Sequence, residues 1–452
     1  MSCVMSDTEI CLTVTGEKHV RSKRKPSHPK VKQTITQLIA MIDEVRDDMD
    51  FPDDLVREIR VSQKHLHFFD SVEDFRDPNK IEYKLSEILL MTFLIMMERG
   101  TSVFTEIADY IEAEQYKFRD IGLLQGCSST PSHDTIRRVF MGIKAEQIGE
   151  ITIQAFRTFL DRLERSIKTG KKQLVAFDGK EVRGTGRAEN TQIPARNISF
   201  LNVYLCGSYL CLASEYVDKK TNEIPVAQEL LKSMNLKGMI LTADALHCQT
   251  DTCEIIRKAK GHYVLTCKTN QKSLYQEIHS RMENNLRKVI KVDRGDRVFF
   301  LYYLPKSYNN LGFTGLTAFV MMFSFVRSST ATEHCFITSL KNDIEIIEAI
   351  EGRWGAESDL HKAKDAIMHE DDIRYTNVNA VHAMAYMNNM IVTLMKLYQV
   401  LAGKRSLAHA RAWVRANPLD SLAGMLALTS SEEIITALEK ELARRARKKN
   451  NQ

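Results

Sequence analysis

The stretch LVAFDGKEVRGTGR, residues 174 to 187, decides the fold of this chain. Its first four residues are apolar and predict a short buried strand, which ends directly on the carboxylate of Asp178. Two cations, Lys180 and Arg183, follow within five residues. An aspartate in this position often closes a strand as a turn residue. The stretch alone therefore leaves two interpretations open, a structural turn or a functional site.

A second stretch repeats this pattern. Residues 239 to 244, MILTAD, predict a short strand that ends on Asp244. In an open α/β sheet, the carboxyl ends of parallel strands face the crevice in which ligands bind. We therefore expect Asp178 and Asp244 to be neighbours, although 66 positions separate them.

The order of the surrounding elements indicates a mixed sheet flanked by helices. After the first strand, two β-rich runs on either side of Gly207-Ser208 predict an antiparallel hairpin. Alternating helices and strands follow, as far as the strand at 262–268. This order is that of the ribonuclease H fold, an α/β class with a mixed sheet. Residues from about 290 to 335 add a β-rich insertion, and helices are expected from Asp343 onward.

A third acid lies in EGRWGAESDLHKAKDAIMHEDD, residues 351 to 372, which predicts an amphipathic helix. Its apolar stripe, which must pack on another element, comprises Ala356, Leu360, Ala363 and Ile367. A charged stripe runs along one shoulder of it and comprises Arg353, Glu357, His361 and Lys364. Glu357 would then stand at the border of the core, flanked by cations. An ordinary surface helix with charge pairs one turn apart has the same pattern.

Three converging carboxylates would repel one another strongly. At about 4 Å and an effective dielectric near 20, each pair costs roughly 4 kcal/mol, or on the order of 12 for three pairs. Such a cluster takes up protons or divalent cations, and hard oxygen ligands on an open site suit Mg²⁺ or Mn²⁺. Two ions about 3.5 to 4 Å apart can promote in-line attack at phosphorus. The predicted chemistry is phosphodiester cleavage or transfer.

Composition and charge bound the class of protein. The 452 residues are 44% hydrophobic, enough for two or three domains with real cores. The net charge of +5 hides two basic clusters. These clusters could bind a polyanion such as nucleic acid, or they could be solvated tails. The N-terminal cluster comprises Lys18, Arg21, Lys23, Arg24, Lys25, Lys30 and Lys32. The C-terminal cluster comprises Lys440, Arg444, Arg445, Arg447, Lys448 and Lys449.

Cysteine usage and hydropathy indicate a compartment. The nine cysteines are scattered singly, without the spacing of a zinc module, which fits a reducing cytoplasm. We find no signal-peptide pattern, and the most apolar window, residues 89 to 97, is far shorter than a membrane span. A soluble cytoplasmic protein is expected.

Seven segments, in order, make the chain resemble insertion-sequence transposases of the H-repeat-associated type, a DDE family that is also called ISAs-one-like. They are PSHDTIRRVF (131–140), AFDGKEVRG (176–184), ADALHCQ (243–249), CKTNQ (267–271), ITSL (337–340), RWGAESDLHKAKDAIMHED (353–371) and the Asn-Ala pair at 379–380. The resemblance runs from about residue 74 to 397. Each segment is weak alone, but seven in sequence are strong.

The resemblance implies that Asp178, Asp244 and Glu357 form a metal-binding DDE triad on a ribonuclease H-like fold, with Mg²⁺ or Mn²⁺, two ions, as cofactor. A signature of the wider group matches Arg353, Glu357 and Lys364, with Ile350 at the position of its tyrosine. Candidate DNA contacts are Lys180, Arg183, Lys268, Arg353 and Lys364, together with Arg137 and Arg138 from the helical region. His247 and His361 are possible auxiliary residues that orient substrate or a bound water, or ordinary structural histidines.

We expect four regions along the chain. They are a basic extension at 1–60, a helical domain at 61–165 that can bind DNA, a catalytic domain at 166–400, and a helical segment with a basic tail at 401–452. The expected function is a DDE transposase that cleaves and transfers double-stranded DNA at element ends and target. We expect it in a bacterial cytoplasm, associated with the nucleoid and not with a membrane. By analogy, it would bind DNA as a homodimer. The alternatives are an inactive or domesticated DNA-binding derivative and a general metal-dependent nuclease.

Overall fold

A computed structural model describes most of the chain. The described residues are 2–6, 9–13, 67–156, 160–161, 172–187, 197–206, 210–218, 222–308, 311–325, 331–401 and 406–416, and the side chains of 2–13, 354–362, 397–398, 400–401 and 413–416 are not among them. Both basic clusters and the hairpin turn at Gly207-Ser208 lie outside the described residues.

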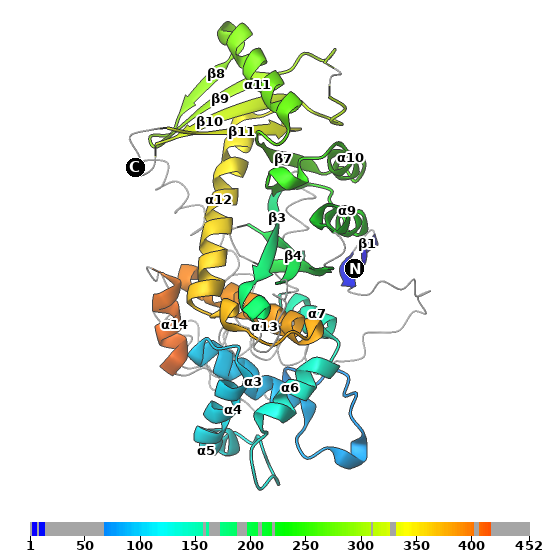
Figure 1. Cartoon of the computed structure of the whole chain (residues 1–452), viewed down its shortest axis with the longest axis vertical. Helices are drawn as coiled ribbons and strands as arrows, with labels where there is room; N and C mark the ends of the chain where they lie inside the picture. Colours follow the sequence, from blue (N-terminus) through cyan, green and yellow to red (C-terminus); the bar gives the residue numbers. More distant parts are fainter. Residues whose placement is uncertain are drawn as a thin grey trace, which may run out of the picture.

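A mixed sheet of nine strands forms the centre of the molecule, in the order β5-β4-β3-β6-β7-β11-β10-β9-β8 (Figure 1). Its strands are β3 (Gln173–Val182), β4 (Ile198–Leu205), β5 (Leu210–Val217), β6 (Met239–Ala243), β7 (His262–Cys267), β8 (Ile290–Asp293), β9 (Arg297–Tyr303), β10 (Ala318–Ser324) and β11 (Thr332–Thr338). A separate two-stranded sheet joins β1 (Ser2–Ser6) to β2 (Glu9–Thr13).

The first five strands of the large sheet combine antiparallel and parallel pairs, as the sequence predicts for a mixed sheet. β3 pairs antiparallel with β4, and β4 antiparallel with β5. On its other side β3 pairs parallel with β6, and β6 parallel with β7. Helix α9 (Glu223–Ser233) connects β5 to β6, and α10 (Thr250–Lys258) connects β6 to β7. The expected mixed α/β sheet is confirmed.

The β-rich insertion extends this sheet. β11 pairs antiparallel with β7, and β10, β9 and β8 continue outward from it. Helix α11 (Lys272–Asn284) lies over the insertion (Figure 1). The inserted strands therefore share hydrogen bonds with the strand that follows α10, and are part of one continuous sheet.

Helix α12 (Asp343–Ala366) covers one face of the sheet (Figure 1). The side chain of Asn342 caps its start by accepting a hydrogen bond from the backbone of Glu345 at 3.0 Å. Ile346 and Ile350 of α12 are buried in a cluster with Ile240 of β6 and Val264 of β7. α12 therefore packs on the central strands β3, β6 and β7.

Helices form the rest of the molecule. They are α3 (Leu85–Arg99), α4 (Phe104–Ala113), α5 (Gln115–Asp120), α6 (His133–Gly142), α7 (Ala145–Ala155), α13 (Val378–Leu401) and α14 (Leu407–Ala416). Short 3-10 turns are η3 (Pro78–Lys80), η4 (Arg183–Arg187), η5 (Ala245–His247), η6 (Leu286–Lys288) and η7 (Glu370–Asp372). α13 contacts α6, α7 and β5, so it joins the helical region to the sheet. Its methionines Met384 and Met387 are buried in the core.

Two helix ends have well-defined caps. Gly100 ends α3 with φ of 70°, a left-handed conformation that glycine adopts without strain. The Ser132 hydroxyl accepts a hydrogen bond from the Thr135 backbone and caps α6. Among the described helices, none alone is long and apolar enough to cross a membrane; α3 and α4 satisfy that test only together, and a bend of 96° separates them.

Candidate active site

Asp178 and Asp244 occupy matching positions on adjacent parallel strands. The ladder between β3 and β6 runs from Gln173 opposite Met239 to Ala176 opposite Thr242. The same register, continued by two residues, brings Asp178 level with Asp244. Because neighbouring strands lie about 4.8 Å apart, the two carboxylates start from neighbouring backbone positions.

Both aspartates are half-buried, on the side of the sheet where the parallel strands β3 and β6 have their carboxyl ends. This region around Asp178 and Asp244 is called the acidic edge below. Asp244 ends the strand and caps η5, with Oδ1 accepting a hydrogen bond from the Leu246 backbone at 3.0 Å. Asp178 lies within β3, opposite Asn202 of β4. The residues that precede them, Phe177 and Ala243, are buried. Each buried strand therefore delivers a carboxylate to the same partly open edge.

A third carboxylate at this edge, Glu223, is absent from the sequence predictions. It is the first residue of α9, and its Oε2 lies 3.5 Å from Nε2 of His247. Its carboxylate also lies against Gly179, where a Cβ would overlap it. Glycine therefore allows α9 to approach β3 between Asp178 and Lys180. The sequence marks Glu223 only as a helix start, so it gave no signal of this contact.

His247, an auxiliary candidate, is buried beneath the acidic edge with 1% of its surface exposed. Its ring packs edge-on against Phe177, with centroids 4.9 Å apart. Neither ring nitrogen has a hydrogen-bond partner within the described part of the chain. The side chains of Glu357 and His361 lie outside the described ones, although the backbone of α12 at both positions is helical.

Ion pairs tie the two ends of β3 to the two ends of α12. At the amino end, Lys172 Nζ lies 2.7 Å from an oxygen of Glu345. At the carboxyl end, Lys180 Nζ lies 2.5 Å from Asp365 Oδ1 and 3.6 Å from Asp371 Oδ1. α12 therefore runs alongside β3 over its whole length.

Lys180 and Lys364, both predicted to contact DNA, are instead buried. The side chain of Lys364 is 1% exposed, with Nζ 3.4 Å from the Glu370 carboxylate and 3.4 Å from the hydroxyl of Tyr204. Lys180 is buried between the two aspartates of its ion pairs. Their ammonium groups hold elements of the protein together, so we remove both from the set of DNA contacts.

Arg353 also faces the sheet. It is 9% exposed, and its guanidinium donates a hydrogen bond to Thr266 Oγ1 of β7 at 2.5 Å. At Arg353 and Lys364, the charged stripe of the helix is therefore buried, whereas the sequence placed it at the shoulder of the apolar stripe. These two charged side chains can be buried because the sheet offers them polar partners, Thr266 for Arg353 and Tyr204 for Lys364.

Other predicted DNA contacts remain on the surface. Lys268 is exposed directly after β7, and Arg183 is exposed beside Asp371. Burial, followed by the charges of Lys268 and Arg353, holds the pKa of the His334 imidazole below its usual range. Lys268 follows the last residue of β7, the strand next to β6, which leads to Asp244. Arg137 and Arg138 are exposed on α6, and Arg137 pairs with Asp134 at 3.1 Å.

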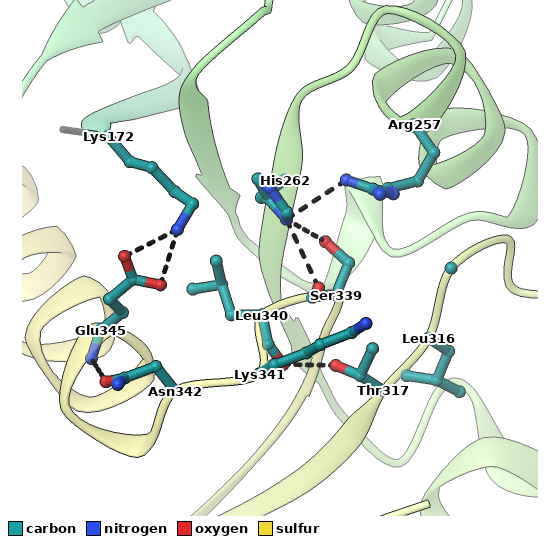
Figure 2. A pocket seen from close by; sticks show the side chains of 11 residues that line it. Lys172, Arg257, His262, Leu316, Thr317, Ser339, Leu340, Lys341, Asn342 and Glu345 are labelled. Atoms are coloured by element: carbon teal, nitrogen blue, oxygen red, sulfur yellow. Dashed lines mark hydrogen bonds and ion pairs between the residues drawn. The ribbon is translucent and has the colours of Figure 1, made fainter. Parts of the chain in front are cut away.

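A separate cavity of about 720 Å³ lies at the other ends of these strands, where β3 and β7 begin. Figure 2 shows its polar lining, which includes Lys172, Arg257, His262, Lys341 and Glu345. These residues stand before β3, before or at the start of β7 and at the start of α12. The cavity is therefore at the amino ends of the strands and takes no part in the acidic edge.

Comparison with protein families identifies the class of protein. Residues 169–394 match the family described as Transposase DDE domain, and residues 66–155 match the family described as DDE_Tnp_1-associated. The chain belongs to the Transposase DDE domain family.

Similar proteins carry related names. The chain is 26% identical over 360 residues to the protein named "H repeat-associated putative transposase YhhI" of Escherichia coli K12, covering 75% of this chain and 91% of that protein. It is 29% identical to "H repeat-associated putative transposase YbfD" of the same strain, covering 47% and 78%. A solved piggyBac transposase synaptic complex with hairpin DNA is 11% identical, with a TM-score of 0.38, covering 91% of this chain and 79% of that one.

Proposed function

We propose that this protein is a DNA transposase in which Asp178, Asp244 and Glu357 bind divalent metal ions and support DNA strand cleavage and strand transfer. The family supports a transposase function. A ribonuclease H-like fold is supported by the strand order, in which β3 pairs antiparallel with β4 on one side and parallel with β6 on the other. We assign that fold to residues 172–394.

The geometry of α12 supports including Glu357. From Glu345 to Asp365 the helix rises about 30 Å, and from Lys172 to Lys180 the strand spans about 26 Å, so the two run nearly in step between their ion pairs. Position 357 is roughly three fifths of the way along this stretch of helix. The same fraction of the strand falls at Phe177, beside Asp178.

The helical register supports the same placement. Position 357 lies four residues after Arg353 and seven before Lys364, so all three share one face of the helix. Arg353 and Lys364 both face the sheet. The backbone position of Glu357 therefore lies on the face of α12 that Arg353 and Lys364 turn toward the sheet, which supports its inclusion in the proposed site.

The donors present fit Mg²⁺ or Mn²⁺. Two half-buried aspartates at one register level, together with the proposed ligand Glu357, would supply hard oxygen ligands that solvent and phosphate oxygens can reach. When bound, such ions stabilise charge at the reacting phosphate and increase the acidity of the attacking hydroxyl. Any two of the carboxylates without cations would repel each other by roughly 4 kcal/mol at 4 Å.

The protein's other residues position substrate and ligands. Lys268 and Arg183 are exposed near the acidic edge and would bind DNA phosphates, while Arg353 contributes positive potential from below the surface. Arg137 and Arg138 of α6 offer a second basic surface on the helical region. The proposed partner is double-stranded DNA, at element ends and target, and joining two ends would suit a dimer.

The shared register of Asp178 and Asp244 carries this proposal, and a nicking assay tests it. Purified protein is incubated with Mg²⁺ and labelled DNA that contains the ends flanking its own gene. Asp178→Asn, Asp244→Asn and Glu357→Gln should each lower nicking at least about a thousandfold, because each removes a metal ligand, while gel-shift binding persists. Asp120→Asn, at an exposed position on α5, is the matched control.

The same assay separates the alternatives. Normal nicking by any of the three carboxylate variants would refute the assignment. Wild-type protein that binds the element ends and never nicks them would indicate a DNA-binding derivative. Equal nicking of element ends and scrambled DNA would indicate a general nuclease.

A further inference from the structure

A group of three different metal-binding side chains lies between α11 and strand β11, apart from Asp178 and Asp244. His279 of α11 has Nε2 2.9 Å from Glu333 Oε1 of β11. Cys335 Sγ of the same strand lies 3.5 Å from that oxygen and 4.0 Å from that nitrogen. All three ligand atoms lie within 4.8 Å of one another. No other such group of three is found among the described side chains, which exclude that of Glu357.

We propose that His279, Glu333 and Cys335 bind one zinc-like divalent cation. In a tetrahedral zinc site, with bonds of about 2.0 Å to nitrogen and oxygen and about 2.3 Å to sulfur, ligand atoms lie about 3.3 to 3.5 Å apart. The three separations of 2.9, 3.5 and 4.0 Å bracket this range. Small side-chain rotations would bring all three atoms to bonding distance.

The chemistry of the ligands selects the metal. A thiolate and an imidazole favour zinc and related transition metals over Mg²⁺, which prefers oxygen ligands alone. Burial, followed by the nearby carboxylate of Glu333, raises the pKa of the Cys335 thiol. A metal that binds there therefore displaces a proton from sulfur, as zinc does in its thiolate sites. This ligand set differs in kind from the all-oxygen acidic edge.

The surroundings complete the site in two ways. Tyr275 of α11 donates a hydrogen bond to Glu333 Oε1 at 2.6 Å, which holds the carboxylate in place as outer-shell partners of metal ligands do. The side chains of His279 and Glu333 are 27% and 26% exposed, whereas Cys335 is buried. A cation can therefore enter from the solvent side, and that side leaves the fourth position to water.

The position of the cluster indicates a structural role. Glu333 and Cys335 are two residues apart on β11 and so face the same side of the sheet, which α11 covers. Cys335 pairs in register with Cys267, the last residue of β7, and β7 is adjacent to β6, which leads to Asp244. A bound ion would fix α11 to β11, roughly 10 Å or two strand spacings from the strand that leads to Asp244.

The sequence pattern could not show this site. The cysteines lack the short spacing of zinc modules, and His279 is 54 residues from Glu333. The ligands come together only because β11 returns beside β7 after the insertion. The inference is independent of the proposed transposase function.

Metal analysis of the full chain tests the proposal. Protein expressed with added zinc sulfate and then passed over a chelating resin should retain about one zinc ion per chain. Cys335→Ser and His279→Ala should bind zinc at least about tenfold more weakly, and Tyr275→Phe about 10- to 100-fold, since outer-shell partners have effects of that size. Cys127→Ser removes a half-buried thiol outside the cluster and should retain the metal.

Cobalt substitution separates metal loss from misfolding. Co²⁺-loaded wild-type and Glu333→Gln protein should show the near-ultraviolet thiolate-to-cobalt absorption, because both keep Cys335. Cys335→Ser should lack this band while its far-ultraviolet circular dichroism matches that of wild type. Wild-type protein that retains no zinc, or a Cys335→Ser variant that keeps full zinc affinity or the band, would overturn the proposal.

Discussion

The two ends of α12, outside the undescribed side chains of 354–362, make different contacts. The amino-terminal end packs through Ile346 and Ile350 on apolar strand residues, with a partly exposed ion pair between Lys172 and Glu345 at its start. At the carboxyl-terminal end, Lys364 is buried beside Glu370, and Asp365 pairs with Lys180 of β3. These ion pairs lie nearer to Asp178 along β3 than the Lys172 pair does.

This difference indicates that apolar contacts mainly stabilise the packing of α12, whereas buried ion pairs mainly fix its position. Apolar packing stabilises the amino-terminal end with little dependence on orientation. Buried ion pairs cost desolvation and are often no more stabilising than apolar residues, but they fix which groups must meet. In this protein the pairs fix α12 against β3 at the level of Asp178. We infer that they position the helix that bears Glu357.

The largest expected effect on stability follows the loss of Lys364. Its partner Glu370 is fully buried, at 0% exposure, so Lys364→Met would leave an uncompensated carboxylate. We expect a loss of about 3–5 kcal/mol in the free energy of unfolding. Chemical denaturation measures it, and the double variant Lys364→Met/Glu370→Gln should recover more than half. No recovery would show that the pair is not the cause.

A smaller effect is expected from two matched lysines, Lys172 just before β3 and Lys180 near its carboxyl end. Lys180→Met should cost about 1–3 kcal/mol in the free energy of unfolding, because Asp365 and Asp371 lose their cation. The loss stays below that of Lys364→Met because both carboxylates are partly exposed and can hydrate. Lys172→Met should cost about 0–1 kcal/mol, because both members of its pair are partly exposed.

The two lysine variants should also differ in nicking at element ends. Lys180→Met should slow nicking well beyond its effect on the folded fraction, since it loosens α12 beside the acids. Lys172→Met should leave the rate near that of wild type. Equal nicking rates for the two variants, measured below their unfolding temperatures, would remove the distinction between the two ends of the helix.

The sequence predicted the features that depend on local pattern. The strand expected to end on Asp244 does end there, whereas the strand expected to end on Asp178 continues to Val182, because residues 179–182 go on pairing with β4. The element order indicated the mixed sheet, in which β3 and β6 are neighbours. Gly100 and Ser132 fit their helix ends because the conformational and hydrogen-bonding requirements there are local.

Features that depend on distant partners were not predictable. Lys180 meets Asp365 across 185 positions, so its pattern alone resembled that of a surface lysine. Lys364 was predicted to contact DNA from a charged stripe at the shoulder of the apolar one, and only the fold supplies Glu370 and Tyr204 as its partners. Glu223 and the cluster of His279, Glu333 and Cys335 likewise become visible only when the strands are assembled.

The central claim is that Asp178, Asp244 and Glu357 bind shared metal ions, and thiophilic rescue tests it most directly. Asp178→Cys, Asp244→Cys and Glu357→Cys are assayed for nicking of element ends with Mg²⁺ and with Mn²⁺. Because a thiolate binds the softer Mn²⁺ better than Mg²⁺, we predict no nicking with Mg²⁺ and partial recovery with Mn²⁺ for at least one aspartate and for Glu357. Full nicking with Mg²⁺ by any variant, or no recovery at any of the three positions, would contradict the account.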